Sequence, residues 1–196
     1  MDFLDQYKKS LYSRMESYNK WQKRKVALMG LERQLKSYCL FSEHHSWNRQ
    51  SEYIELFDLF WDSVLECQLL EENVWKYHEA IRPENIGLHP YSDELELNYN
   101  FCCIFACNVE EFLNTLLDDT EDEESYLLLF LDYIVCWLNE TGENKGYDVA
   151  KYLSSRLIQN ELTIQNTDIA EVFHINTFEE VVKWRMNVKN VLCCQD

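Results

Sequence analysis

Cysteine is the residue type with the most reactive side chain in this sequence, but the spacing of the cysteines does not fit a metal site. The chain has eight cysteines and no C-x-x-C pair, which is the usual spacing in structural zinc sites. Cys102 and Cys103 lie on one predicted helix, where adjacent side chains point about 100° apart and cannot readily share an ion. We therefore predict no metal and no cofactor, and we expect five cysteines to be small buried core residues: Cys39, Cys67, Cys103, Cys107 and Cys136.

One histidine motif has the spacing of a metal-binding helix. Glu171 and His174 form an E-x-x-H, in which residues i and i+3 face the same way, as the ligands of helical di-iron sites do. Such sites need two copies of the motif, and this chain has one. We interpret the motif as a chance occurrence.

The sequence contains no recognisable motif of nucleophilic or phosphate-transfer catalysis. It lacks G-x-S-x-G, a Walker loop and G-x-G-x-x-G, and its four glycines leave little material for a phosphate-binding loop. Carboxylates are so frequent between residues 110 and 124 that no pair stands out as acid and base. We predict no catalytic residue and expect that the protein is not an enzyme.

An acidic run is the most distinctive local feature. Residues 118–124 hold six acids in seven positions, and residues 51–150 carry 24 Asp and Glu against three Lys and Arg, whereas residues 1–50 carry ten Lys and Arg against five acids. An acidic surface attracts a basic protein and steers its approach. We predict a partner-binding surface made of these acids and of Trp47, an aromatic residue in a polar loop: Glu110, Glu111, Asp118, Asp119, Glu121, Asp122, Glu123, Glu124 and Trp47. The alternative is that the acids form a solvated loop and a helix N-terminus, and only keep the protein soluble.

The net charge of -17 argues against several classes of partner. An acidic middle section repels nucleic acid and anionic membranes, so we predict neither as a partner. No run of about 18 apolar residues occurs, and the first residues lack the basic and apolar segments of a secretory signal. We therefore expect a cytoplasmic protein whose thiols are reduced.

Helical periodicity and scarce turn residues predict an all-α fold. The chain has four Gly and two Pro, far fewer turn residues than an all-β protein of this length needs. The clearest helical pattern has apolar residues at steps of three and four between acids: Tyr53, Phe57, Phe60, Trp61 and Val64. We predict a loop at 42–48 and helices at 3–19, 20–40, 50–69, 71–82, 93–117, 121–140, 147–159, 167–174 and 177–192. They would form a single compact domain over residues 1–196, with roughly seven to nine helices.

A family resemblance rests on several motifs in the first half of the chain: Trp21-Gln22, Leu31-Glu32-Arg33, Tyr38, Phe41 and Phe57-Asp58-Leu59-Phe60-Trp61. Their ungapped spacing resembles the N-terminal half of the YjaG-like family of uncharacterised bacterial proteins, over about residues 20–83. Ala80 and Ile81 also fit the family's Ala-Ile-Pro turn, although Arg82 stands before Pro83 here. The resemblance implies an all-α, cytoplasmic, bacterial protein, and it implies no activity.

Three polar residues of the resembling stretch stand among apolar positions: Glu32, Arg33 and Asp58. We interpret these positions as a sign of a buried or half-buried ion pair between Arg33 and a carboxylate, which fixes the packing of the helices. Such pairs are more often structural than catalytic.

Three hypotheses for function follow. The favoured one is an acidic binding protein, specifically an immunity protein that neutralises a basic toxin, such as a nuclease, by direct contact. The second is a housekeeping YjaG-like protein with a structural or regulatory role. The third is a metal-dependent helical enzyme built around Glu171 and His174.

Overall fold

The structure is a computed structural model that describes residues 3–45, 49–71, 74, 76–77, 81, 97–119, 134 and 149–188. All regular secondary structure in these ranges is helical: α1 (Phe3–Met15), α2 (Lys20–His45), α3 (Gln50–Glu66), α5 (Leu97–Leu117), α7 (Val149–Ser154), α8 (Arg156–Glu171), the 3₁₀ helix η3 (Val172–His174) and α9 (Phe178–Asn187). The predicted all-α fold is therefore confirmed for this part of the chain. Apart from Ile134, the predicted helix at 121–140 lies outside the described residues, and so does most of the one at 71–82. The total number of helices and the single domain over residues 1–196 stay predictions.

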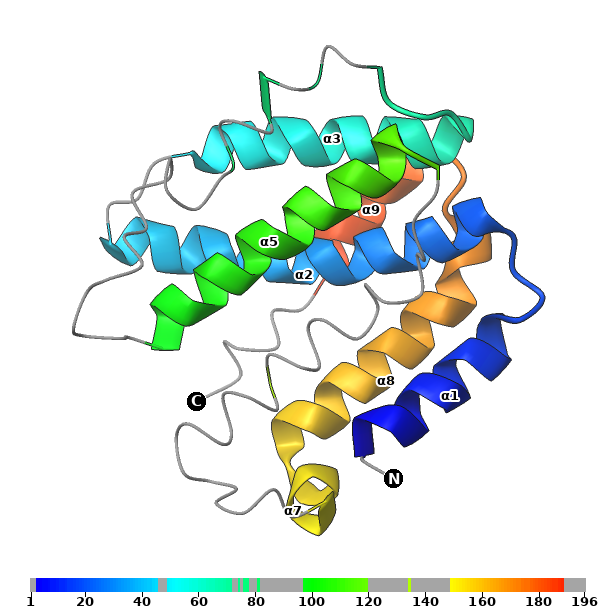
Figure 1. The fold of residues 1–196 in the computed structure, drawn as a ribbon, viewed down its shortest axis with the longest axis vertical. Helices are drawn as coiled ribbons and strands as arrows, with labels where there is room; N and C mark the ends of the chain where they lie inside the picture. Colours follow the sequence, from blue (N-terminus) through cyan, green and yellow to red (C-terminus); the bar gives the residue numbers. More distant parts are fainter. Residues whose placement is uncertain are drawn as a thin grey trace.

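Helix α2 is the element around which the others are arranged. It crosses the middle of the molecule, with α3 along one side, α5 in front, α9 behind, and α8 and α1 below (Figure 1). It contacts α3, α5, α8 and η3 directly. Helices α1 and α8 lie side by side, and the hydroxyl of Tyr18, just after α1, donates to the Ile169 carbonyl oxygen of α8 at 2.9 Å.

The burial of α2 on several faces explains its central place. Four consecutive residues, 26–29, have exposed fractions of 2% or less. These four residues span one full turn, so the helix is buried on every face here, which requires other helices around it. Its start is fixed by a reciprocal cap, in which the Gln22 amide donates to Asn19 Oδ1 at 3.0 Å and the Asn19 amide donates to Gln22 Oε1 at 2.9 Å. This cap separates α2 from α1, which ends at Met15 rather than at the predicted residue 19.

The predicted loop at 42–48 is wrong for residues 42–45, because α2 continues to His45. Ser42 is buried, and its hydroxyl donates to the Cys39 carbonyl oxygen at 2.9 Å within the helix. The polar side chain thus finds a partner without leaving the helix. A run of polar residues predicts a loop only where their side chains find no hydrogen-bond partner within the helix.

A group of aromatic rings fills the space between α2, α3 and α5. Tyr38 lies edge-on to Tyr53, with ring centroids 4.8 Å apart, and Phe105 is 5.0 Å from Tyr53. Phe60 packs against Phe112 at 5.1 Å. These rings are fully buried, and each such pair adds about 0.5–1.5 kcal/mol to the stabilisation from burial alone.

The C-terminal helices differ from the predicted ranges. The predicted helix at 147–159 is interrupted at Ser155, which is extended, so α7 ends at Ser154 and α8 starts at Arg156. The predicted short helix at 167–174 is the end of α8 together with η3. Helix α9 is shorter than the predicted 177–192, because the structure ends it at Asn187.

The expected burial of the cysteines is wrong at two positions. Cys67 and Cys107 are exposed, and Cys39 and Cys103 are half-buried. Cys102, which was not among the expected core cysteines, is the buried one on α5. The reason is the orientation of α5, which turns the face of Cys102, Phe105 and Val109 toward the core and the face of Cys107 away from it. Cys136 lies outside the described residues.

Candidate functional site

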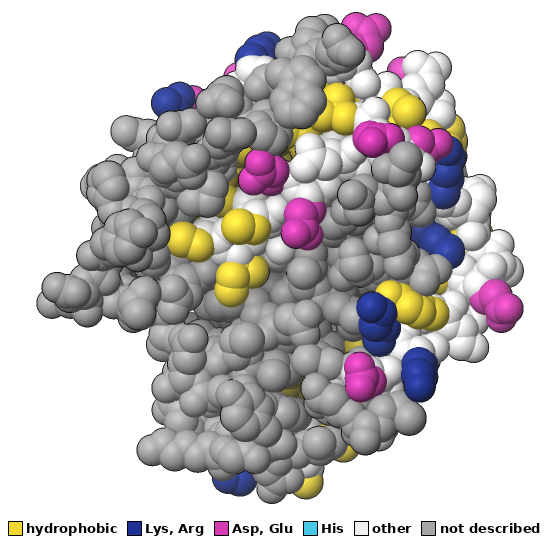
Figure 2. Space-filling view, in the orientation of Figure 1, with side chains coloured by type: hydrophobic (Ala, Val, Ile, Leu, Met, Phe, Trp, Pro, Cys, Tyr) yellow, Lys and Arg dark blue, Asp and Glu magenta, His cyan; other side chains and the backbone are white. Residues whose placement is uncertain are grey.

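The predicted acidic surface is described at its start only. Glu110 is half-buried and Glu111 exposed on α5, and Asp118 and Asp119 are exposed just after the helix ends. On the face in Figure 2, Asp and Glu side chains lie over α3 and α5, and Lys and Arg gather along the edge formed by α1 and the start of α2. The remaining predicted contact residues lie outside the described part of the chain: Trp47, Glu121, Asp122, Glu123 and Glu124.

Asp119 has partners within the chain. Its carboxylate accepts a hydrogen bond from Lys20 and a second one, at 2.9 Å, from the buried guanidinium of Arg24. These hydrogen bonds lower the pKa of Asp119 below its ordinary value, and the bond from Lys20 has the largest effect. Arg24 also donates to the Thr115 carbonyl oxygen at 3.1 Å and stacks over the Trp21 ring. Asp119 therefore ties the end of α5 to the start of α2, a structural role beside the predicted one.

Asp118 differs from its neighbour. It is exposed, and no ion pair joins it to another described residue. The last turn of α5 carries no basic residue, and the C-terminal end of a helix is already negative. Lys20 and Arg24 of α2 lie at the same helix end, on Asp119 and the Thr115 carbonyl oxygen, and neither forms an ion pair with Asp118. Asp118 therefore adds an exposed negative charge beside a partly compensated helix end.

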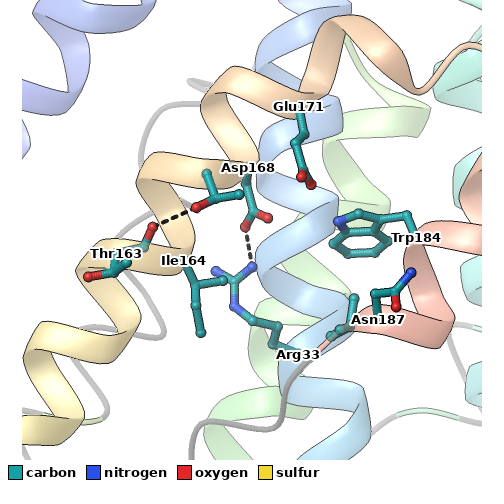
Figure 3. Close-up of a pocket in the computed structure, with 9 residues that line it drawn as sticks. Arg33, Thr163, Ile164, Asp168, Glu171, Trp184 and Asn187 are labelled. Atoms are coloured by element: carbon teal, nitrogen blue, oxygen red, sulfur yellow. Dashed lines mark hydrogen bonds and ion pairs between the residues drawn. The ribbon is translucent and has the colours of Figure 1, made fainter.

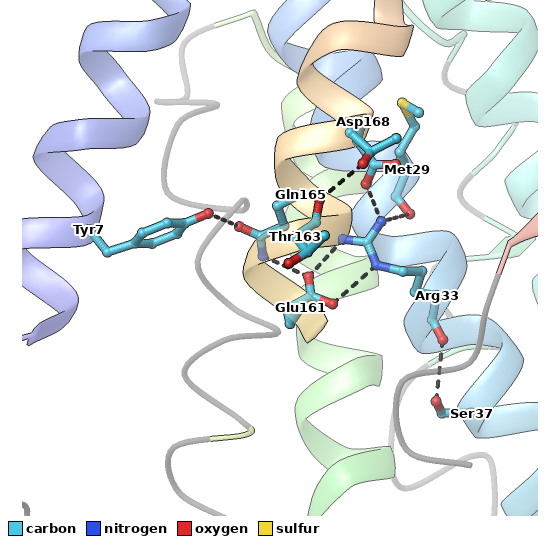
Figure 4. A network of polar contacts seen from close by, with 9 residues as sticks. Tyr7, Met29, Arg33, Ser37, Glu161, Thr163, Gln165 and Asp168 are labelled. Atoms are coloured by element: carbon cyan, nitrogen blue, oxygen red, sulfur yellow. Dashed lines mark hydrogen bonds and ion pairs between the residues drawn. The ribbon is translucent and has the colours of Figure 1, made fainter. Parts of the chain in front are cut away.

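The predicted ion pair of Arg33 exists, and it is buried (Figure 4). Its partners are two carboxylates of α8. The guanidinium donates to Glu161 through Nη2 at 2.7 Å and Nε at 3.3 Å, and to Asp168 through Nη1. The two carboxylates point at the same guanidinium because residues 161 and 168 are two turns apart on α8.

Further hydrogen bonds extend this network to α1. Gln165, between the two carboxylates on α8, donates to Glu161 at 2.7 Å and accepts from the Tyr7 hydroxyl at 2.7 Å. Burial raises the pKa of the Tyr7 hydroxyl above its usual range, and the charge of Glu161 adds to this effect. The network thus joins α1, α2 and α8 through hydrogen bonds between their side chains.

The charges of this network do not cancel, because one guanidinium faces two carboxylates. Burial raises the pKa of Asp168 to about 6; Arg33 opposes the rise, and the charges of Glu161 and Glu171 add to it. Asp168 is therefore protonated more readily in the folded protein than an exposed aspartate.

A second network links α9 to α2 and α3. Arg185 of α9 donates through Nε to Glu32 Oε1 at 2.6 Å and through Nη1 to Asp58 Oδ1 at 2.5 Å. The Trp61 indole N–H donates to the same Glu32 oxygen at 2.7 Å. Burial raises the pKa of Glu32, while Arg185 acts in the opposite direction. Lys36 also donates to the Arg185 and Val188 carbonyl oxygens at the end of α9.

A pocket of about 300 Å³ lies where α2, α8 and α9 meet. The Arg33–Asp168 ion pair forms part of its lining, the Trp184 ring forms one wall, and the Glu171 side chain extends from α8 toward Trp184 (Figure 3). Five other residues complete the lining: Thr163, Ile164, Thr167, Asn187 and Val188. Sequence reasoning missed this pocket, because Asp168, Trp184 and Asn187 belong to no motif.

The E-x-x-H motif does not form a metal site with other described residues. Glu171 is the last residue of α8 and His174 lies in η3, and both are exposed. Among the residues that the structure describes, no group of three or more His, Cys, Asp or Glu is placed to hold a metal ion. In the same part of the chain, none of the helices combines the length and apolarity needed to cross a membrane.

Comparisons with known proteins give a fold. No protein-family model matches the sequence, and no curated protein matches it. A solved structure does match, that of a DUF416 family protein from Shewanella baltica OS155, with a TM-score of 0.76 over 92% of this chain and 96% of that one. The sequence identity is 16%, so the likeness establishes the fold and nothing finer. Since DUF416 corresponds to the YjaG-like family, the chain has the fold of that bacterial family, and the resemblance of residues 20–83 is confirmed at the level of the fold.

Proposed function

We propose that this chain is a non-catalytic, cytoplasmic binding protein that captures a basic protein at the acidic end of α5. The observation that supports the proposal is Asp118, an exposed acid at a helix C-terminus that has no basic residue in its last turn. Lys20 and Arg24 pair with the neighbouring Asp119 and form no ion pair with Asp118. The Asp118 carboxylate is therefore available to a cationic partner.

The surroundings of Asp118 support this role. The sequence continues from Asp119 into Glu121, Asp122, Glu123 and Glu124, so negative charge accumulates from the end of α5 onward. The contacts of Asp119 with Lys20 and Arg24 hold the end of α5 against α2. A charged surface on a fixed element gives fast, steered association with a partner of opposite charge.

An immunity role is the specific form of this proposal. A basic toxin such as a nuclease has a cationic surface for its nucleic acid, and an acidic protein that covers this surface blocks it by contact alone. No group of the acidic surface then needs to take part in chemistry.

A role common to YjaG-like proteins, structural or regulatory, is the second candidate. The fold match favours it, because the matching protein is described by its family alone. A family role predicts no protection against a toxin, whereas the immunity role requires it.

Co-purification tests the proposal. The product of the gene directly upstream is co-expressed with this protein and captured at low and at high salt. We expect a complex with a basic protein that weakens as salt rises, because salt screens exposed charges. Failure to capture a basic protein at low salt would sink the proposal and leave the family role ahead.

Two matched variants locate the contact surface. Asp118→Lys reverses the charge at the end of α5, and Glu16→Lys makes the same change at an exposed acid after α1. We expect the first variant to slow association several-fold and the second to leave it nearly unchanged. Equal effects of the two variants would show that only the net charge of the protein matters.

A further inference from the structure

The pocket between α2, α8 and α9 has carboxylate oxygens that no donor among the described residues reaches. Asp168 is 3% exposed, and its Oδ2 accepts from Arg33, but no hydrogen bond from a described residue reaches Oδ1. No ion pair joins the Glu171 carboxylate to another described residue. These carboxylate oxygens line the pocket without a donor among the described residues, so a ligand that donates hydrogen bonds would fit it.

We propose that this pocket binds a small organic cation, namely an alkylammonium or guanidinium group on a short apolar chain. The proposal goes beyond the protein-binding function and does not depend on it.

The charge of the lining selects a cation. The lining contains one cationic side chain, Arg33, and two carboxylates, Asp168 and Glu171. A third carboxylate, Glu161, pairs with Arg33 from outside the lining. The guanidinium already donates to both Glu161 and Asp168, so it is engaged within the protein. An anion would meet uncompensated negative charge, whereas a cation would complete the network.

The remaining lining suits the apolar chain of such a ligand. Ile164, Trp184 and Val188 supply apolar surface, and the face of a Trp ring is the best aromatic surface for a cation. Trp184 is held in place, because its ring packs 5.8 Å from that of the buried Trp61. A volume of about 300 Å³ lies at the lower end of small-molecule sites and fits a ligand of several heavy atoms.

Isothermal titration calorimetry of the full chain at pH 7.5 tests the proposal, with 1,5-diaminopentane as the probe. The matched controls are 1,5-pentanediol and glutarate, which have the same chain length but are neutral and anionic. We expect saturable binding of the diamine with a dissociation constant at or below about 1 mM, and at least tenfold weaker binding of both controls. Absence of binding of the diamine, or equal binding of the diol, overturns the proposal.

Glu171→Gln shows whether binding occurs at this pocket. Glu171 is exposed, so the amide leaves the core intact, and an unchanged melting temperature verifies this. Losing one charge-assisted hydrogen bond weakens binding about tenfold, whereas Glu16→Gln, at an exposed acid after α1, leaves the affinity unchanged. If Glu171→Gln binds the diamine as the unmodified chain does, the pocket is not the site and the proposal is wrong. Capture of a basic protein is measured separately with both variants, so each proposal can fail without the other.

Discussion

Replacing Arg33 with Met tests whether the ion network is the main polar link between α2 and α8. The substitution keeps a long side chain and removes the positive charge. Glu161 and Asp168, whose side chains are 0% and 4% exposed, would then lie buried without a cation. Their carboxylates would have to protonate or draw in water.

The size of the effect follows from burial. Removing one partner of a buried ion pair costs about 3–5 kcal/mol, because the remaining charge loses its compensation. Arg33 serves two carboxylates, so we expect Arg33→Met to lie at the upper end of this range at pH 7. For a protein of about 200 residues, such a loss lowers the melting temperature by roughly 10 °C or more.

The assay is urea unfolding at pH 7 and at pH 5, followed by circular dichroism. Without Arg33, which lowers the pKa of Asp168, the pKa of this buried carboxyl group rises further in the folded state. The folded variant then binds more protons than the unfolded chain, so its stability increases as the pH falls. The destabilisation by Arg33→Met is therefore expected to be smaller at pH 5 than at pH 7.

Two further variants control this interpretation. Lys183→Met breaks the exposed pair of Lys183 with Glu179, whose side chains are 68% and 78% exposed, and is expected to cost less than about 1 kcal/mol. A triple variant with Arg33→Met, Glu161→Gln and Asp168→Asn leaves no buried charge and is expected to recover part of the lost stability. If Arg33→Met costs no more than Lys183→Met, the network does not hold α8 on α2 and the reasoning is refuted.

Three other substitutions probe the same helices. Because the pKa of Asp168 is raised to about 6 in the folded protein, the stabilisation from its protonation is full below the unfolded pKa and is lost as the pH rises through about 6. Urea unfolding between pH 4 and 8 is expected to show this gain in stability on acidification in the unmodified chain. The gain is expected to be absent in Asp168→Asn. Thr177→Ala removes the side-chain cap that accepts from the Glu180 amide at 3.3 Å, and is expected to lower the free energy of unfolding by about 1 kcal/mol in the same assay. Gly30→Ala adds a methyl group whose nearest neighbour, Arg33 Nη2, is 3.8 Å away, so the group fits without a clash. Because Ala is the better helix former, the free energy of unfolding is expected to rise by roughly 0.5–1 kcal/mol, and a lower melting temperature would contradict this.

Amphipathic helices could be predicted from the sequence, and helices with polar residues on the buried face could not. The predicted helix at 50–69 is close to α3, because its apolar residues follow the helical period and its acids face outward. Helix α8 buries Glu161, Gln165 and Asp168 alongside Ile158. These polar residues stand at the inward positions of the helix, so its apolar periodicity is too weak to predict one helix from Arg156 to Glu171.

The same burial of polar residues explains how much of the candidate site could be predicted. The family resemblance pointed to Arg33 as one member of a buried ion pair, and this is correct. Its partners Glu161 and Asp168 are 128 and 135 residues away in the chain. One sequence contains no signal for such a pairing, because the contact exists only after α8 has packed on α2.

The positions of the ion pairs separate residues that hold the fold from residues available for binding. Helix α2 contributes Arg24, Glu32 and Arg33, and each of them meets its opposite charge on a different helix or at a helix end. Of these three pairs, only Arg24–Asp119 joins the basic first quarter to the acidic middle, and the other two join α2 to the C-terminal helices α8 and α9. Asp118 and Glu171 lie outside these pairs among the described residues, and both are exposed. Substitutions in the α2 pairs should consequently change the melting temperature first, whereas substitutions of Asp118 and Glu171 should change binding at an unchanged melting temperature.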